Sequence, residues 1–357
     1  MRTRLVYWAA PVGMAVVIAA IVAFSSGAQA EPTLPELTAE QLVANVAAAQ
    51  PAAFSGTVAI TTDIGLPDLS ALQNLMGQQM GGLTTLLGGT TQLKAAVDPT
   101  VGARAEIDSN TSAWVAVANV ANNDAWAYIS DSSSAIHLTG GTGTLSDPAT
   151  ALTPANLADN LIAAASPSTN FTVAASKTIA GRPAYTLGMT PSDAGSLISA
   201  VDVFIDANTW MPLGVDIWST QLAGQPALSA RFTSISYSAP PASLFDFSAP
   251  PDATVNTVDL SQPAPGPTNT DPADDIPSVK VVAGQGWASI AEVTGLPHDL
   301  AAALADPSQL SPLLGDIAQQ TAAGTEYTTY LGSVLVTPSG DVFAGAVPAS
   351  ALESAAA

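Results

Sequence analysis

The stretch "AWVAVANVANNDAWAYISDSSSAIHLTG" (113–140) decides the fold class, because it holds three short strand-like runs separated by turns. The runs are 113–119, 124–130 and 134–140, and the turns between them contain Asn122-Asn123 and Asp131-Ser132. Two similar runs, 92–98 and 103–108, come directly before. Consecutive strands joined by tight turns indicate an antiparallel meander and not alternating β and α units.

Strands and helices continue on both sides of this meander. Upstream, 37–50 predicts a helix with Thr38 as its N-cap and Gln41 as the capping-box partner, and 54–64 predicts a strand with one buried face. Downstream, 153–166 predicts a second helix. Further strands are expected at 171–181, 182–191, 199–220 and 227–238, with a turn at 206–208 and an extended stretch at 242–255.

The chain divides into four parts by composition. Residues 1–30 have arginines at 2 and 4, a long apolar run and an Ala28-Gln29-Ala30 cleavage pattern, which indicates a signal peptide or an uncleaved membrane anchor. Residues 31–256 form the main domain, and 257–278 is a Pro- and Asp-rich linker. Residues 279–357 predict a small α/β domain with strand 279–293, a helix-forming stretch at 298–323 and a hairpin at 330–347. Either reading of the N-terminus places the remainder outside the cytoplasm.

Charge and residue types exclude several function classes. Without residues 1–30 the chain has six basic and 29 acidic residues, a formal charge of −23, which disfavours nucleic acid and electrostatic docking on anionic lipid. There is no cysteine, and the sequence contains no G-x-S-x-G, H-E-x-x-H or P-loop motif. The two histidines, His137 and His298, lie far apart in the sequence and are interpreted as structural. The sequence therefore predicts no enzyme, no metal and no cofactor. Asp202 and Asp206, four residues apart on one face of a strand, are interpreted as exposed acids near a turn, with a carboxylate pair as the alternative.

A glycine-rich segment at 66–89, which carries no charge from residue 69 onward, interrupts the strands. Its leucines and methionines repeat at helical spacing, and five glycines make that helix easy to break. Two interpretations remain open: a mobile flap over an apolar cavity, or a static cap on the core. Trp114 and Trp126, in adjacent expected strands, either pack the sheet or contact a ligand. The candidate ligand-binding residues are Leu69, Leu72, Leu75, Met76, Met80, Leu83, Leu86, Leu87, Trp114 and Trp126.

Three blocks resemble the LolA-like lipoprotein-carrier family. They are the helix and strand "LTAEQLVANVAAA…FSGTVAIT", the stretch "NNDAWAYISDSSSAIHL" (122–138), and "SLFDFSAPPDATV" (243–255). Together they span 37–255 in the family's order, and the overall pattern looks closest to exported LolA-like proteins of actinobacteria. The regulator RseB/MucB has a related fold. No family role is carried onto Arg104, because the family's gating arginine has no counterpart at the matching place.

The resemblance implies an α+β fold with an open, curved antiparallel half-barrel, helices on its concave side and a cavity for acyl chains. It implies a non-enzymatic, exported carrier of lipids or lipoproteins at the cell envelope. The alternative is an RseB-like envelope sensor that binds a membrane partner through 279–357.

Overall fold

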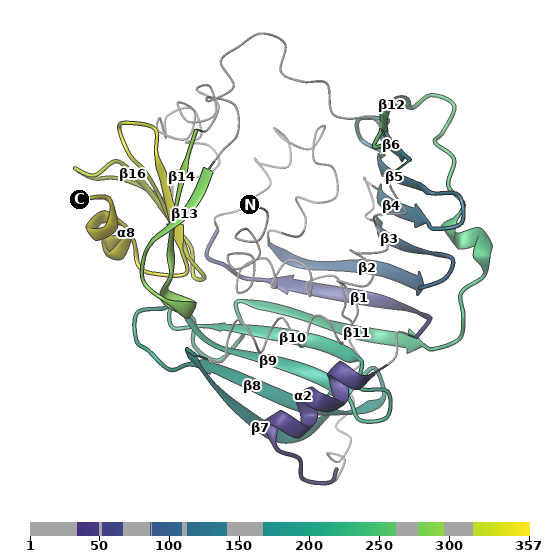
Figure 1. Ribbon diagram of the computed structural model, residues 1–357, viewed down its shortest axis with the longest axis horizontal. Coiled ribbons are helices and arrows are strands. Elements are labelled where there is room, and N and C mark those ends of the chain that lie inside the picture. Colours follow the sequence, from purple (N-terminus) through teal and green to yellow (C-terminus); the bar gives the residue numbers. More distant parts are fainter. Residues whose placement is uncertain are drawn as a thin grey trace.

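The chain folds around two β-sheets that face each other (Figure 1). The structure is a computed structural model that describes residues 34–49, 52–66, 86, 88–108, 113–140, 167–261, 278–295 and 317–357. Within these residues one sheet has twelve strands and the other has six. The protein is therefore mainly β, and the described part contains two α-helices, α2 and α8.

The twelve-stranded sheet has the order β12-β6-β5-β4-β3-β2-β1-β11-β10-β9-β8-β7. Its central strand β1 pairs with β2 on one side and with the distant β11 on the other, so it joins the two halves. The strands are β1 (Phe54–Thr62), β2 (Gly89–Asp98), β3 (Gly102–Asp108), β4 (Ala113–Asn119), β5 (Asp124–Ile129), β6 (Ser134–Thr139), β7 (Thr169–Ile179), β8 (Arg182–Pro191), β9 (Ile198–Asp206), β10 (Pro212–Ser219), β11 (Leu228–Ser236) and β12 (Thr254–Asp259). The expected meander is thus confirmed.

One expectation about this sheet is wrong: it is mixed and not wholly antiparallel. After the short 3₁₀ helix η2 (Ala242–Phe245) the chain crosses the outside of the sheet and returns as β12, which pairs with β6 in parallel. A parallel neighbour requires such a crossover, which a meander lacks. β12 also takes in residues 257–259, at the start of the expected linker.

Helix α2 (Ala39–Ala48) begins as its sequence predicts. The Thr38 side chain accepts a hydrogen bond from the Gln41 amide, and the Gln41 side chain accepts one from the Thr38 amide. Leu42 and Val46 are buried on one helical face and pack in the main core with Leu187 and Tyr185 of β8. The Tyr185 hydroxyl donates to the Pro35 carbonyl and fixes the chain just before the helix. As expected, α2 covers the concave side, over β7–β9 (Figure 1).

The convex side of β8–β11 buries two aspartates that the sequence did not mark as buried. Asp216 is fully buried and accepts hydrogen bonds from Arg231 and from Ser229. Asp206 is also fully buried and pairs with Arg182, so the interpretation of Asp206 as an exposed acid is wrong. Buried carboxylates need such partners, because an unpaired buried charge is costly.

The C-terminal unit is an antiparallel sheet with the order β13-β14-β18-β17-β16-β15, with α8 (Ala349–Ala356) packed on one face. The hairpin expected at 330–347 is confirmed, with its turn at 337–341. The end of the expected helix 298–323 is instead a strand, because 318–320 pairs with β16. The strands are β13 (Ser278–Ala283), β14 (Ile290–Thr294), β15 (Ala318–Gln320), β16 (Thr325–Thr328), β17 (Ser333–Val336) and β18 (Val342–Gly345).

A buried acid lies beneath α8. Glu326 is 6% exposed, it stands opposite Leu335 on the face that packs against Leu352, and its Oε1 has no hydrogen-bond partner. Burial raises the pKa of Glu326, and the neighbouring Glu353 raises it further. The folded state therefore disfavours the ionised form of the Glu326 carboxyl group. Ionisation does not destabilise the protein below the pKa that Glu326 has in the unfolded chain, and the loss of stability grows as pH rises through the raised pKa of the folded state.

We expect Glu326→Gln to stabilise the protein at neutral pH, by about 1 kcal/mol, because no charge is then buried without a partner. Thermal unfolding from pH 4 to pH 8 measures the effect. The stability of the parent should fall over that range relative to the variant, and Glu353→Gln should recover part of the difference. Equal pH dependence of parent and Glu326→Gln would contradict this account.

The two sheets are joined by a built interface and not by the linker alone. Trp287, in the 3₁₀ helix η3 (Gly286–Ala288), is buried in the main core, and its indole Nε1 donates to Thr169 Oγ1 at 2.7 Å. The Leu197 amide donates to the Ala346 carbonyl, and the Tyr330 amide donates to the Ile64 carbonyl. These bonds fix the six-stranded sheet at one end of the large sheet.

Candidate functional site

The concave face of β2–β6 is apolar from one strand to the next. Antiparallel registers place Leu93 opposite Ile107, Ile107 opposite Trp114, and Trp114 opposite Ile129 on one face. The same face carries a row of small side chains. The residues with side chains on this face are Thr91, Leu93, Ala95, Val97, Ala103, Ala105, Ile107, Trp114, Ala116, Ala118, Ala125, Ala127, Ile129, Ser134, Ile136 and Leu138.

This face carries no ionisable side chain within β2–β6. Along each of these five strands, every Lys, Arg, Asp, Glu and His occupies a position that alternates with the concave-face residues. These ionisable side chains therefore point to the convex side. Such segregation is typical of a sheet with one face against apolar material. Leu93 and Ile107 are buried in the main core, whereas most of the alanines are only half-buried and Ile136 is 45% exposed.

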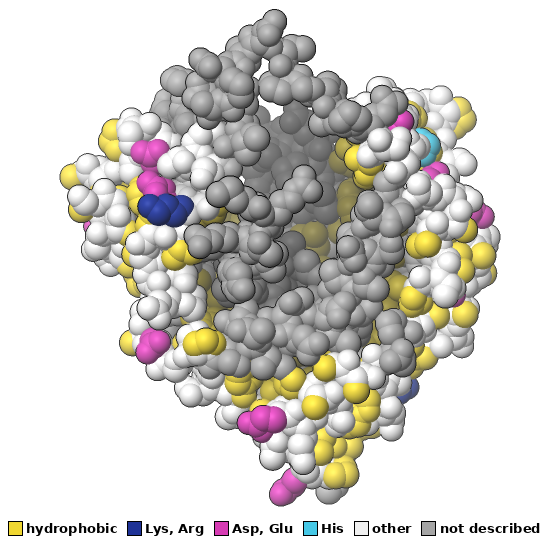
Figure 2. Space-filling view, in the orientation of Figure 1, with side chains coloured by type: hydrophobic (Ala, Val, Ile, Leu, Met, Phe, Trp, Pro, Cys, Tyr) yellow, Lys and Arg dark blue, Asp and Glu magenta, His cyan; other side chains and the backbone are white. Residues whose placement is uncertain are grey.

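The described helices lie elsewhere. α2 covers the β7–β9 part of the concave side, η2 lies on the convex side, and α8 lies on the far face of the six-stranded sheet (Figure 1). Figure 2 shows the molecule hollowed between the two sheets, with hydrophobic side chains visible on the walls. Because alanine side chains are short, they do not extend far from the backbone of this part of the sheet, and the surface they form is wide and lined by methyl groups.

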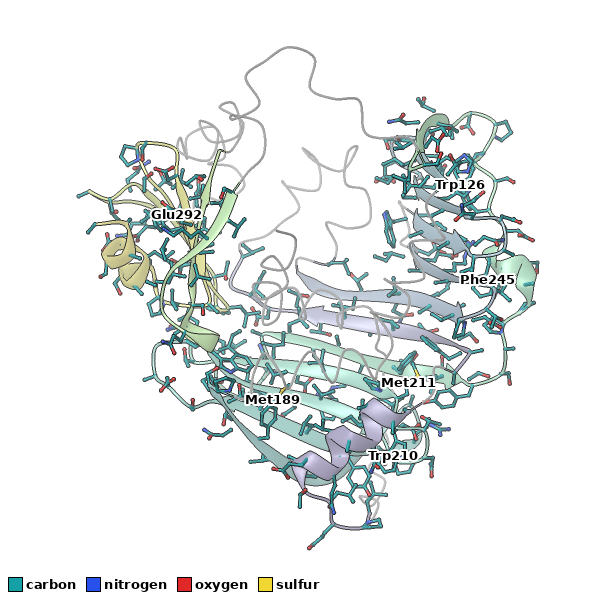
Figure 3. All side chains as sticks on the ribbon, viewed as in Figure 1. Trp126, Met189, Trp210, Met211, Phe245 and Glu292 are labelled. Atoms are coloured by element: carbon teal, nitrogen blue, oxygen red, sulfur yellow. The ribbon has the colours of Figure 1, made fainter. Side chains whose placement is uncertain are left out.

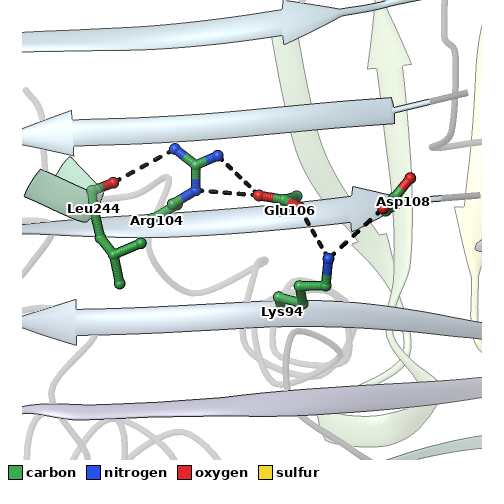
Figure 4. Close-up of polar contacts among 5 residues, drawn as sticks. All are labelled: Lys94, Arg104, Glu106, Asp108 and Leu244. Atoms are coloured by element: carbon green, nitrogen blue, oxygen red, sulfur yellow. Dashed lines mark hydrogen bonds and ion pairs between the residues drawn. The ribbon is translucent and has the colours of Figure 1, made fainter. Parts of the chain in front are cut away.

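On the convex face of the same strands the charged side chains form ion pairs with one another (Figure 4). Lys94 lies 3.1 Å from Glu106 and 3.7 Å from Asp108, and Arg104 Nη2 lies 2.8 Å from Glu106. Burial alone would raise the pKa of Glu106, but hydrogen bonds from Arg104 and Lys94 lower it below its usual value. Arg104 also donates to the Leu244 carbonyl of η2. These residues stabilise the outside of the sheet and do not contact the concave face.

The two candidate tryptophans lie on opposite faces. Trp114 points to the concave side and packs against the rim of the main core. Trp126 pairs with Val117 on the convex side, where it stacks on His137 at a centroid distance of 3.8 Å and contacts Phe247. Phe245 lies on the same outer side (Figure 3). The register of the β4–β5 hairpin explains the difference. Each even-numbered residue of β4 stands opposite an odd-numbered residue of β5 and shares a face with it. Trp114 and Trp126 both have even numbers, so their side chains lie on opposite faces.

The segment expected to form a flap or cap is described only at its ends. Leu86 is partly buried against the main core, and its carbonyl accepts a hydrogen bond from Thr62 Oγ1 at 2.9 Å. Gly65, at the other end, has φ +77° and lies against the Tyr330 ring. Seven candidate residues lie outside the described residues: Leu69, Leu72, Leu75, Met76, Met80, Leu83 and Leu87.

The six-stranded sheet presents a second apolar face toward the large sheet. The face opposite α8 carries Val293, Val336 and Val342, which pack together with Tyr327. Val279 and Val281 of the edge strand β13 belong to the same face and are 44% and 45% exposed. Apolar side chains therefore lie on both sides of the hollow.

The described histidine and its acidic partner lie on the outside of the large sheet. His137 Nε2 lies 3.2 Å from Asp124, and the pair sits on the convex side; His298 lies outside the described residues. In the part of the chain that the structure describes, no three acids or histidines are grouped so that they could hold a metal ion. Nor does that part contain a helix of sufficient length and hydrophobicity to cross a membrane. The candidate site is thus a surface for apolar contact.

Comparison with known proteins finds similarity of structure only. No family model and no curated protein matches the sequence. The solved complex of MucA and MucB from Pseudomonas aeruginosa aligns with a TM-score of 0.45 and 15% identity, over 89% of this chain and 96% of the matched chain. A LolA superfamily protein of Nitrosomonas europaea aligns with a TM-score of 0.23 and 12% identity, over 59% of this chain and 99% of that one.

A third structure is a putative outer membrane lipoprotein-sorting protein domain from Vibrio parahaemolyticus. It aligns with a TM-score of 0.21 and 9% identity, over 56% of this chain and 89% of the matched chain. The chain is similar in structure, at low sequence identity, to MucB and to LolA superfamily proteins.

Proposed function

We propose that this chain is an exported, non-enzymatic carrier that binds the acyl chains of lipids or lipoproteins on the concave face of β2–β6. The observation that supports it is the complete segregation of charge: five adjacent strands place every ionisable side chain outside and apolar side chains inside. Export is inferred from the N-terminal apolar run and its arginines.

The magnitudes favour a ligand held between walls over one lying on a single open face. A 16-carbon chain gains roughly 12 kcal/mol when fully buried, at about 0.8 kcal/mol for each methylene. On one open face about half of this gain remains, roughly 6 kcal/mol. The loss of translational and rotational freedom, roughly 4–15 kcal/mol, offsets most or all of it. The carrier therefore needs apolar contact on a second side, for which Val279 and Val281 of β13 are suitably exposed. No charged anchor is required.

The experiment uses stearic acid that carries a nitroxide, which quenches nearby tryptophan fluorescence. Because Trp114 faces the concave side and Trp126 the convex side, Trp114→Phe should remove most of the saturable quenching and Trp126→Phe should leave it nearly unchanged. Circular dichroism checks that both variants fold. Quenching that does not saturate, or that depends on Trp126 more than on Trp114, would count against the carrier.

The alternative function is an envelope sensor that binds a membrane protein through residues 279–357. The observation that favours it is the exposed pair of valines on β13, at the edge of the six-stranded sheet. Native mass spectrometry of the purified protein separates the two functions. Co-purifying lipid supports the carrier, and a membrane protein recovered only when residues 279–357 are present supports the sensor.

A further inference from the structure

The outer edge of the large sheet ends in an unprotected strand. All six residues of β12 are exposed, and β12 pairs only with β6 among the described residues. The Thr254 amide donates to the Ser133 carbonyl and the Leu260 amide donates to the Thr139 carbonyl, so even-numbered amides point inward. Because amides alternate along a strand, those of Val255 and Thr257 point outward. Within the described residues no hydrogen bond reaches these outward groups.

Apolar side chains flank this edge on both faces. Val255 is 44% exposed, Val258 is 39% exposed and Leu260 is 47% exposed, and the adjacent Ile136 of β6 is 45% exposed. The register places Val258 beside Leu138 on the concave face, and Val255 beside Ala135 on the convex face. A strand added at this edge would find apolar contacts on both faces of the sheet, for the side chains that point to the concave side and for those that point to the convex side.

The other sheet edges carry features that block strand addition, and β12 does not. β7 has Lys177 and a register shift between Ala174 and Lys177. β13 has Lys280 and a shift between Val281 and Ala283. β15 is only three residues long. Lysines, bulges and short length are the usual protection of edges, whereas β12 runs six residues in uninterrupted register without lysine or proline.

The surroundings of β12 are acidic. Residues 113–140 and 236–261 contain no Lys or Arg, but they contain five aspartates, of which four, Asp131, Asp246, Asp252 and Asp259, are exposed. The chain as a whole has a formal charge of −21, which opposes pairing of two copies through this edge. A partner strand with basic side chains meets a complementary field, and a second copy of this chain does not.

We propose that the outer edge of β12 accepts an extended, basic segment of a partner polypeptide as an additional strand of the large sheet. Backbone hydrogen bonds to Val255 and Thr257 fix the register, Val258 and Ile136 contact apolar side chains of the segment, and the aspartates attract its cations. This edge borders the acyl-binding face and shares Ile136 with it. The backbone hydrogen bonds of β12 take no part in acyl binding, so failure of the peptide to bind leaves the carrier proposal intact.

The test uses the full-length protein and a short capped peptide of alternating lysine and valine. Amide hydrogen exchange should slow at Val255 and Thr257 when this peptide is added, and polarisation of the labelled peptide gives its affinity. A peptide of alternating glutamate and valine should bind at least about tenfold more weakly because its charge is repelled. A lysine–valine peptide with methylated backbone nitrogens should not protect the two amides.

Matched variants test the same edge from the protein side. Thr257→Pro removes one outward amide, which an edge strand tolerates, and should weaken binding about tenfold, whereas Thr257→Ala should not. Equal binding of the lysine and glutamate peptides, or of the methylated peptide, would overturn the proposal. So would protection of these amides by a rise in protein concentration alone, or by phosphatidylcholine vesicles in place of peptide.

Discussion

Replacing Asp206 by alanine should lower the free energy of unfolding by about 3–5 kcal/mol, because it leaves a partly buried guanidinium without its carboxylate. Asp206 is fully buried at the end of β9, where it accepts hydrogen bonds from Arg182 and from the amides of Asn208 and Thr209, at 2.8 and 3.2 Å. The Tyr237 hydroxyl donates to it at 3.1 Å. Burial raises the pKa of Tyr237 to about 12, so this donor keeps its proton.

The pH dependence of this contribution follows from the same contacts. Burial alone would raise the pKa of Asp206, but the bonds from Arg182 and the turn amides lower it below its ordinary value. Stability from Asp206 is therefore complete above the unfolded pKa, near 3.9, and is lost as pH falls through the lower folded pKa.

Urea unfolding of Asp206→Ala at pH 7 measures the loss, and Asp202→Ala is the matched control. Asp202 lies on the same strand and face but accepts one bond, from Trp218 Nε1 at 3.0 Å, so its removal should cost only about 1 kcal/mol. Similar losses in both variants would contradict the assigned role of the Asp206 network.

The meander and the capped helix are predictable from sequence because both depend on local signals. Thr38 and Gln41 satisfy each other's backbone groups within one turn, and Asn122-Asn123 forms a turn between neighbouring strands. Both features need no information about distant parts of the chain.

The features that sequence reasoning missed depend on contacts between distant residues. The burial of Asp206 depends on its ion pair with Arg182, which is 24 residues away in the sequence. No local sequence pattern predicts that pair. The parallel strand β12 depends on where the chain returns after η2. The opposite orientation of Trp114 and Trp126 was accessible in principle, since it follows from hairpin parity once the turn residues are fixed.

A single charge on the concave face should abolish acyl binding. Ala116 is half-buried in the middle of β4, with Ala105 and Ala127 beside it on the concave face. Ala116→Glu puts a carboxylate among methyl groups with no cation on that face of β2–β6, and burying it against an acyl chain costs several kcal/mol. We expect at least a roughly hundredfold loss of affinity, at about 1.4 kcal/mol for each factor of ten.

Gln92→Glu is the matched control, because Gln92 is exposed on the convex face of β2 and acquires the same charge. Ala116→Gln separates the size of the new side chain from its charge, and should retain more affinity than Ala116→Glu. Thermal unfolding confirms that each variant is folded before binding is compared.

The measurement that tests the central claim most directly is the affinity of a fluorescent fatty acid for Ala116→Glu and for Gln92→Glu. If acyl chains bind on the concave face, the first variant loses binding and the second keeps the affinity of the parent within about twofold. Equal affinities in the two variants would show that the apolar concave face of β2–β6 is not where acyl chains bind.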